Sequence, residues 1–382
     1  MTIDSPTAGA LRAARVQRGW SQSDAAREIV ELGRRRGAPV AAAASLKTLL
    51  SRWENGHVVP EPQYRELLAE LFGRTAAELG IDPHARSEGP VEGAARLRAA
   101  LAEAAAVDDT AVSLWREQLA VARRLDDELG AAGAGGLVRV QMEQLDRTLA
   151  HTLTPTVRGA VGAVLAGAAS LAGAQALDAG EPDRAWEAYL RARSAAAVAH
   201  QQVAAATALA GLAAVLVDVA EPDSALTLLG DEPPEGPPGA TARWAAAVGL
   251  ARAASGQASA AQAAFGRAEQ ATLAAGTGQG GPAGVRPDLF WPSTVDCELL
   301  DLRRRKGHAL ALLGDPSAAG PLAGALAAEP PSTRHRAELH ADLAVTLSAR
   351  DPDAAADHAR QARALAIRIG SKRIPARLGA GS

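Results

Sequence analysis

Apolar residues recur every three or four positions along most of this chain, which is the period of an α-helix with one buried face. In the first eighty residues the periodic stretches are short, and glycine or proline separates them. They predict five helices, beginning near residues 11, 21, 45, 63 and 75. Beyond about residue 96 the stretches lengthen and become rich in alanine and leucine, which lead the helix-propensity scale. Because only 3% of residues are aromatic, strands have little support, and the pattern predicts an all-α protein.

The ends of two short helices carry local signals. Ser21, with Asp24 three residues later, is typical of a helix N-terminus closed by a capping box, and we expect this second helix to end at Gly33. Thr75 and Glu78 repeat the spacing and predict a short fifth helix. Five such helices predict one compact N-terminal unit.

The third predicted helix has two unlike faces. Ser45 is its expected N-cap, and Leu46, Leu50 and Trp53 follow at the spacing of a buried face. Polar residues occupy the other face, namely Lys47, Thr48, Ser51 and Arg52. A helix that lies in the major groove of DNA needs this combination, because its polar face reads bases while its apolar face holds it on the domain.

Local charge supports this interpretation. The whole chain has a net charge of −3, which excludes a strongly basic protein that coats nucleic acid. Residues 12–52 nevertheless carry nine Arg or Lys against three acidic residues, whereas residues 53–84 carry two against six. Phosphates respond to local positive charge, so the first stretch suits a small DNA-binding domain.

Two motifs in this region resemble a known family. "GWSQSDAA" resembles the start of the second helix, and "LSRWENG" with the following "VPEP" the end of the recognition helix, in phage-repressor-like (XRE-type) helix-turn-helix domains. The resemblance covers about residues 11–81, and the long "GRRRGAPVAAAA" stands where the family has a tight turn. It implies that Trp53 is a core residue and that Glu54 accepts hydrogen bonds inside the fold. It also implies base contacts from Lys47, Thr48 and Arg52, and backbone contacts from Ser21, Gln22, Ser51 and Asn55, to which the charge run adds Arg34, Arg35 and Arg36.

These assignments have simpler alternatives. Lys47 and Arg52 would also suit a solvated helix face, and a run of three arginines often marks an exposed loop. If the long connection between the second and third helices prevents DNA reading, the head would instead be a protein contact on a repeat scaffold. The main hypothesis is a sequence-specific transcriptional regulator, and the scaffold is its rival.

A spacing pattern repeats in the C-terminal half. Gly173 is followed by Gly180, Ala185 and Tyr189, and Pro or Ser turns such as "GEPDRAW" and "AEPDSAL" fall in register with the copies. The further copies are Gly249, Gly256, Ala261, Phe265; Gly307, Gly314, Ala319; Ala213, Ala220, Ala225, Leu229; and Leu343, Arg350, Ala355, Ala359. Small residues at these offsets let paired helices approach closely, while the large residue fills the gap to the next pair.

This pattern resembles the tetratricopeptide repeat (TPR) over roughly residues 165–370. The resemblance implies a solenoid whose inner groove binds a peptide, a small molecule or a protein effector, and we expect that groove to be alanine-rich with few charges. Phe290 and Trp291, in an insert between repeats, either contact the effector or plug a gap between irregular repeats. A repressor-like head joined to such a tail is familiar in actinobacterial proteins.

The expected organisation is therefore a small five-helix helix-turn-helix head and a TPR-like α-solenoid. The predicted parts are residues 1–84 (DNA-binding head), 85–95 (linker), 96–153 (helical connector) and 154–382 (repeats). Because one small head covers little DNA, we expect a homodimer that reads two half-sites.

Other chemistry has little support. The cluster His335, Glu338, His340 and Asp342 lacks zinc-protease spacing, no set of catalytic residues is evident, and we expect neither enzyme activity nor a cofactor or metal. The single cysteine, Cys297, cannot form an internal disulfide. The start of the chain lacks an apolar signal segment, and residues 158–177 contain too little Leu, Ile or Phe for a membrane span, so we expect a cytoplasmic protein without membrane contact.

Overall fold

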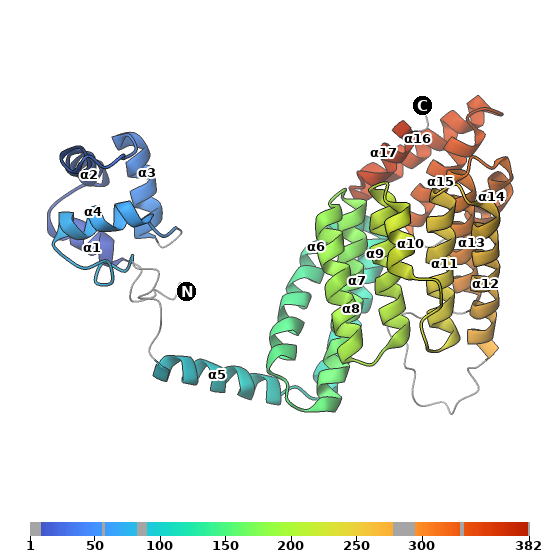
Figure 1. Cartoon of the computed structure of the whole chain (residues 1–382), viewed down its shortest axis with the longest axis horizontal. Coiled ribbons are helices and arrows are strands. Elements are labelled where there is room, and N and C mark those ends of the chain that lie inside the picture. Colours follow the sequence, from blue (N-terminus) through green and yellow to red (C-terminus); the bar gives the residue numbers. More distant parts are fainter. Residues whose placement is uncertain (1–8, 56–57, 82–89, 278–294, 329–331, 381–382) are drawn as a thin grey trace. The chain divides into compact units, whose positions relative to one another are not determined.

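The computed structural model describes residues 9–55, 58–81, 90–277, 295–328 and 332–380 (Figure 1). All regular structure in these ranges is helical, which confirms the predicted all-α class. The chain divides into two compact units, residues 1–99 and 100–382, and the boundary falls within α5 (Pro90–Ala105). The stretch expected to be linker, 85–95, thus ends inside a helix.

Four helices precede α5 in the first unit and are called the head below: α1 (Ala10–Gln17), α2 (Gln22–Arg36), α3 (Ala43–Glu54) and α4 (Pro62–Phe72). One apolar core joins them, with Leu11, Ile29 and Leu50 almost completely buried. The rings of Trp53 and Tyr64 pack in this core with centroids 5.2 Å apart. The predicted core position of Trp53 is confirmed.

The boundaries of two head helices differ from those predicted. The second helix does not end at Gly33, but continues to Arg36 and closes with Gly37 in the left-handed conformation. Gly33 serves close packing instead, because a Cβ there would lie 2.7 Å from Val40 Cγ1. The third helix begins at Ala43 rather than after a Ser45 cap, since the alanines before Ser45 extend the helix. Much of the apparent insert is therefore helical, and the connection is residues 37–42.

The predicted fifth helix of the head is wrong. The capping interactions themselves form, since the Glu78 amide donates to Thr75 Oγ1 at 3.2 Å and the Thr75 amide to Glu78 Oε2 at 2.8 Å. The chain nevertheless makes only turns over residues 75–80, and Leu79 and Ile81 then enter the core. Gly80, with positive φ, stops the segment before a second helical turn can form.

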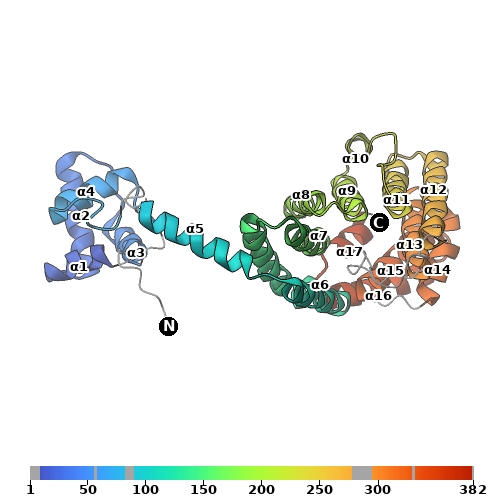
Figure 2. The same ribbon diagram turned by 90° about the horizontal axis from the view of Figure 1, so that it is seen from below.

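The second unit consists of paired helices in two rows (Figure 2). It opens with α6 (Asp109–His151), which is kinked at Gly130. The inner row is α7 (Pro155–Asp178), α9 (Gln202–Asp218), α11 (Pro238–Ala254), α13 (Val295–Leu312) and α15 (Thr333–Leu347). The outer row is α8 (Pro182–Val198), α10 (Pro222–Leu229), α12 (Ala258–Thr277), α14 (Ala319–Ala327, after the 3₁₀ turn η1, Pro316–Ala318) and α16 (Pro352–Ile369). Inner helices pack against their inner neighbours, and each outer helix covers them from outside.

Glycines of the inner row receive large side chains of the outer row, as the repeated spacing predicts. A Cβ at Gly173 would lie 2.8 Å from Tyr189 Cε2, one at Gly249 2.7 Å from Phe265 Cε2, and one at Gly307 2.6 Å from Leu322 Cδ2. Most of the alanines in the pattern are buried, but in the copy after Gly314 the buried one is Ala318, not Ala319. The 3₁₀ turn there shifts the register by one residue.

The two ends of the second unit meet. Both α15 and α16 pack against α6, and the last helix, α17 (Arg373–Ala380), lies inside the row and contacts α7, α15 and α16 (Figure 2). The Lys372 amide donates to the Asp178 carbonyl at 2.9 Å, and the Ser371 hydroxyl to the Asp178 carboxylate at 2.5 Å. The array is therefore closed on itself instead of an open solenoid.

One described helix, α7, is long and apolar enough to cross a membrane. It packs between α6, α8 and α9, and much of its surface is buried in these contacts. A core helix of a water-soluble protein has these properties, so the fold is compatible with a soluble protein.

Candidate functional site

The outer face of α3 is the polar surface that the sequence predicts. Lys47, Thr48 and Arg52 are exposed on it, and Ser51 is half-buried beside them. The opposite face is fixed to the head by the buried side chains of Leu46, Leu50 and Trp53. The three side chains assigned to base contacts therefore share one face of a helix whose other face is anchored.

A buried carboxylate holds α3 in place. Arg15 on α1 donates to both oxygens of Glu54, from Nε at 2.5 Å and from Nη2 at 3.1 Å, and its Nη1 donates to the Trp20 carbonyl at 2.6 Å. Gln22 on α2 adds a bond from Nε2 to Glu54 Oε2 at 2.8 Å. The hydrogen bond with Glu54 raises the pKa of Arg15. The predicted role of Glu54 as an internal acceptor is confirmed, and three helices meet at this one group.

Two predicted backbone-contacting residues at the start of α2 already have partners. Gln22 uses one amide N–H on Glu54, and Ser21 belongs to the predicted capping box. The Asp24 amide donates to Ser21 Oγ at 3.1 Å, and the Ser21 amide to Asp24 Oδ2 at 2.9 Å. Hydrogen bonds from Ser21 lower the pKa of Asp24 and keep its carboxylate charged. A phosphate at this helix end would meet that charge.

The three arginines lie at the other end of α2, about 20 Å along the helix axis from Ser21. Arg34 donates to Glu31 Oε1 at 2.8 Å, and Arg36 pairs with Glu70 at 2.5 Å. Arg35 lies 3.7 Å from Glu31. All three side chains are exposed, and they lie on the last turn of α2 rather than in a loop.

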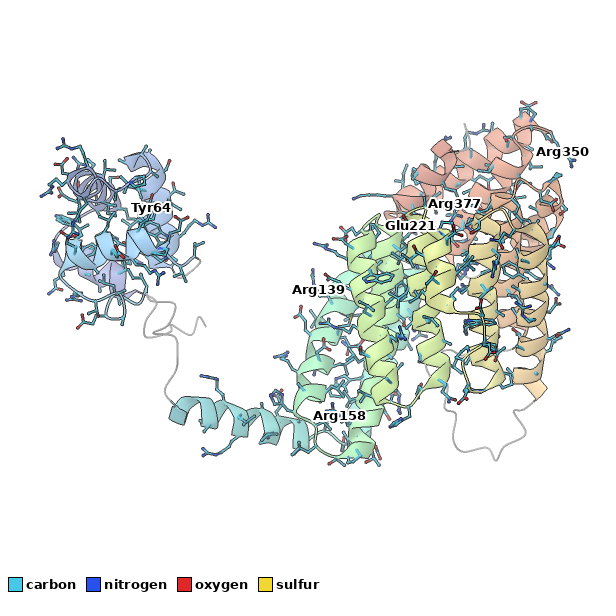
Figure 3. The ribbon with its side chains drawn as sticks, viewed as in Figure 1. Tyr64, Arg139, Arg158, Glu221, Arg350 and Arg377 are labelled. Atoms are coloured by element: carbon cyan, nitrogen blue, oxygen red, sulfur yellow. The ribbon has the colours of Figure 1, made fainter. Side chains whose placement is uncertain are left out.

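The connection from α2 to α3 is fixed to the core. Besides the contact of Val40 with Gly33, the Ala41 amide donates to the hydroxyl of Tyr64 at 3.0 Å (Figure 3). At the other end of α3, Asn55 is the C-cap residue, and its side-chain amide donates to the Ser51 carbonyl at 2.8 Å. The orientation of α3 is thus set at both ends.

The candidate effector residues Phe290 and Trp291 lie outside the described residues. In the second unit, α13, α15 and α17 carry a network of charged side chains, so the expectation of few charges fails at this end of the row. Many alanines of the inner row are buried in contacts between helices, where close approach needs small side chains.

The inner charges are organised by α13, α15 and α17. Arg304 on α13 pairs with Glu338 on α15 and donates to Asp301 Oδ1 at 2.7 Å. Burial alone would raise the pKa of Asp301, but the guanidinium groups of Arg305 and Arg304 hold it well below its usual range. Glu338 keeps a lowered pKa in the same way, chiefly through Arg304. These carboxylates are therefore charged although buried.

The last helix supplies two more cations to this network. Arg373 donates from Nε to Asp218 Oδ1 at 2.6 Å, and Arg377 from Nη1 to Asp342 Oδ1 at 3.0 Å. Nδ1 of His308 lies 3.0 Å from the same Asp342 oxygen. Ion pairs of this kind, made between four helices, hold α17 against the inner row.

The cluster on α15 that resembled a metal site has other partners. Glu338 and Asp342 bind arginines, and Nδ1 of His340 lies 2.8 Å from Nδ1 of His358 on α16. Burial and the nearby Arg304 lower the pKa of His335 to about 4. Across the described residues, no group of three or more His, Cys, Asp or Glu side chains is placed to hold a metal ion.

Sequence reasoning missed the partner of Glu54 in the head and the whole inner network of the second unit. The sequence does contain a signal for this network. Pairs of charged residues recur four positions apart, and so on one face of a helix, in a region otherwise rich in alanine. The pairs are Asp301 with Arg305, Glu338 with Asp342, and Arg373 with Arg377.

Comparison with known proteins gives no assignment, since no family model, no curated protein and no solved structure matches this chain.

Proposed function

We propose that this protein is a sequence-specific DNA-binding transcriptional regulator, in which the XRE-like head reads duplex DNA through α3 and the TPR-like second unit senses or docks an effector. The observation that carries the proposal is the single polar face of α3, with Lys47, Thr48 and Arg52 exposed on it. Arginine and lysine are the side chains that most often recognise guanine, and threonine contacts either polar base edges or the thymine methyl.

Rigid support of α3 also favours this function. The bonds from Arg15 and Gln22 to Glu54, and the bond from Ala41 to Tyr64, fix α3 on three neighbouring elements. A reading helix must keep its side chains in register with base edges, and elements held by packing and hydrogen bonds do this better than loops.

Two copies of the head would be needed for useful specificity, because one such module buries little DNA. The proposal therefore includes a homodimer that binds two half-sites about one helical turn apart. The second unit and the residues around α6 are the surfaces that would join the copies.

The test is to purify the full-length protein, sequence the genomic DNA that it retains, and measure binding to the enriched duplex by fluorescence anisotropy. Arg52→Ala should weaken specific binding by about 5- to 150-fold and relax base preference at one position, which corresponds to about 1–3 kcal/mol. A charge-matched control is Arg363→Ala, an exposed arginine on α16, which should leave binding unchanged.

Two results would reject the proposal. If the triple variant Lys47→Ala, Thr48→Ala, Arg52→Ala binds the duplex as the unmodified protein does, α3 is not the reading helix. If no duplex is enriched and affinity does not fall with rising salt, the head does not bind DNA and the protein-contact alternative replaces it.

A further inference from the structure

The outer row of the second unit is interrupted at α10. The outer helices α8, α12 and α16 contain 17, 20 and 18 residues, whereas α10 contains eight and α14 nine. It ends at Gly230, whose φ of 71° turns the chain away into residues 231–237. The shortened helix packs on α9 and α11 but leaves part of the α11–α12 surface uncovered.

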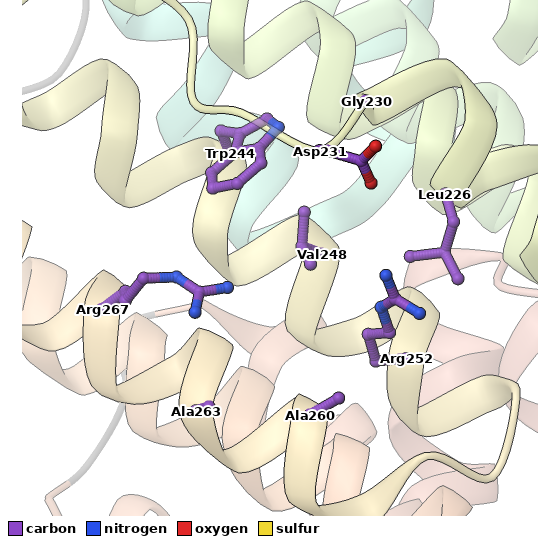
Figure 4. A pocket seen from close by; sticks show the side chains of 9 residues that line it. All are labelled: Leu226, Gly230, Asp231, Trp244, Val248, Arg252, Ala260, Ala263 and Arg267. Atoms are coloured by element: carbon purple, nitrogen blue, oxygen red, sulfur yellow. The ribbon is translucent and has the colours of Figure 1, made fainter.

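A cavity of about 390 Å³ lies in this uncovered region, between α10, α11 and α12 (Figure 4). Its apolar lining comes from Trp244 and Val248, which are almost fully buried, and from Leu226 and Ala263, which are more exposed. Trp244 is buried and fixed, because its indole N–H donates to the Leu229 carbonyl at 2.9 Å. The cavity is thus formed by the fold itself and has a rigid wall.

Charged side chains surround this apolar lining. Arg252 on α11 and Arg267 on α12 extend toward the hollow from two sides, and Asp231 lies across from them (Figure 4). Arg252 donates from Nη1 to Gln257 at 2.6 Å, and no carboxylate in the described part of the chain pairs with either Arg252 or Arg267. Two cations against one anion leave the cavity with an excess positive charge.

We propose that this cavity binds a small organic anion, in which a carboxylate or phosphate group meets Arg252 and Arg267 while an apolar body lies between Leu226 and Ala263, over Trp244 and Val248. The guanidinium group presents paired N–H donors that match the oxygens of both anions. The volume suits a molecule of roughly ten to twenty heavy atoms, within the range of small-ligand sites. The carboxylate of Asp231 repels a bound anion. This repulsion lowers the affinity and favours ligands whose charged group lies near the arginines and away from Asp231.

In the proposed function the second unit senses an effector, and this cavity would determine that the effector is a small organic anion. The inference rests on the proposed function only in this respect. Its test measures ligand binding without DNA, so failure here leaves the DNA-binding proposal untouched.

The experiment is isothermal titration calorimetry of the full-length protein at low salt with phenyl phosphate, benzoate and, as an uncharged probe of similar shape, benzyl alcohol. At least one anion should bind with a dissociation constant of about 1 mM or lower, and benzyl alcohol should bind at least tenfold more weakly. Arg267→Gln should weaken the anion by about tenfold or more, and Asp231→Asn should strengthen it. Ala263→Trp, at an exposed position, should block the cavity by filling it.

The matched control is Arg363→Gln, which removes the same charge from the exposed surface of α16 and should leave binding unchanged. The proposal is overturned if neither anion binds at about 10 mM. It is equally overturned if an anion binds but Arg267→Gln and Ala263→Trp do not weaken it, since the ligand would then lie elsewhere. It is also overturned if Asp231→Asn abolishes binding, since the aspartate would then hold the ligand instead of opposing it.

Discussion

Arg334 on α15 lies against Asp126 on α6, which precedes it by 208 residues, with Nη1 to Oδ2 at 2.5 Å and Nη2 to Oδ1 at 3.1 Å. The same guanidinium reaches Asp178 on α7 through Nε at 3.1 Å. Because the pairing joins the beginning of the second unit to its end, it closes the row of helices. Both carboxylates are almost fully buried, at 2% and 6% exposed. Their negative charge must therefore be compensated by the guanidinium of Arg334, because water does not reach them.

Arg334→Met should therefore destabilise the second unit strongly. The variant keeps the apolar stem of the side chain but leaves two buried carboxylates without their cation, which typically costs about 3–5 kcal/mol. Urea denaturation followed by circular dichroism measures the change. As a control, Arg191→Gln removes the half-exposed pair with Asp146 and should cost less than about 1 kcal/mol. Equal, small losses in both variants would show that the closure contributes little to stability.

A second prediction concerns the turns between paired helices. Ala220 adopts a φ of 62° at the position where the other repeats place Gly180, Gly256 and Gly314, all with φ near 70°. Left-handed backbone is unfavourable for a residue with a Cβ, by about 1 kcal/mol. Ala220→Gly should therefore stabilise the protein and raise its denaturation midpoint.

Gly256→Ala is the matched reverse change. A methyl group at Gly256 meets no atom within 4 Å, so the variant tests backbone strain alone and should lose about 1 kcal/mol. If Ala220→Gly does not stabilise while Gly256→Ala destabilises, the turn at Ala220 does not carry the strain that its φ implies.

The parts of the fold that sequence reasoning predicts correctly depend on neighbours within a few residues or on a repeated spacing. The capping box of Ser21 and Asp24 is such a local feature, and the contact of Gly173 with Tyr189 follows from an offset that recurs. Thr75 and Glu78 show the limit of local signals, because the bonds form although no helix follows.

The features that sequence reasoning missed depend on distant partners. Nothing near Arg334 indicates that Asp126 is its partner, and nothing near Arg15 points to Glu54. The predicted end of α2 was wrong for a related reason. Gly33 resembles a helix end in the sequence, but a glycine is needed there because Val40 packs against it. In the candidate site, the exposed face of α3 follows from helical periodicity, whereas the cavity beside α10 depends on the length of α10 and on its neighbours in space.

A third prediction concerns acid stability. Burial first, and then the positive charge of Arg304, lower the pKa of His335 to about 4, against about 6.5 in an unfolded chain. The unfolded chain therefore binds a proton at a higher pH than the folded protein. Stability from this group is complete above about pH 6.5 and decreases as the pH falls toward 4. His308 is half-buried, desolvation also lowers its pKa, and it acts in the same direction.

The measurement is the denaturation midpoint between pH 7 and pH 5, a window in which the paired carboxylates stay mostly charged in both states. His335→Gln should reduce the dependence of the midpoint on pH, because glutamine does not titrate. His151→Gln, at the last residue of α6 and outside the inner network, serves as the control for replacing a histidine. An unchanged slope in His335→Gln would contradict the assignment of this histidine.

The final prediction links the stability of the head to its proposed function. Glu54→Gln replaces the buried carboxylate by a neutral amide of nearly the same shape, so Arg15 loses its counter-charge and Gln22 faces a group that also donates. Breaking a buried ion pair in this way costs about 3–5 kcal/mol, which is a large share of the stability of a small unit. The control Glu66→Gln removes an exposed carboxylate on α4, and it should change neither stability nor binding. Differential scanning calorimetry of the full-length protein should show the transition of the head moving to lower temperature while that of the second unit stays in place.

If α3 reads DNA, affinity for the enriched duplex should fall with the fraction of folded head and recover on cooling. A head that loses stability but keeps full DNA affinity at temperatures where it is unfolded would mean that the bound surface lies outside α3.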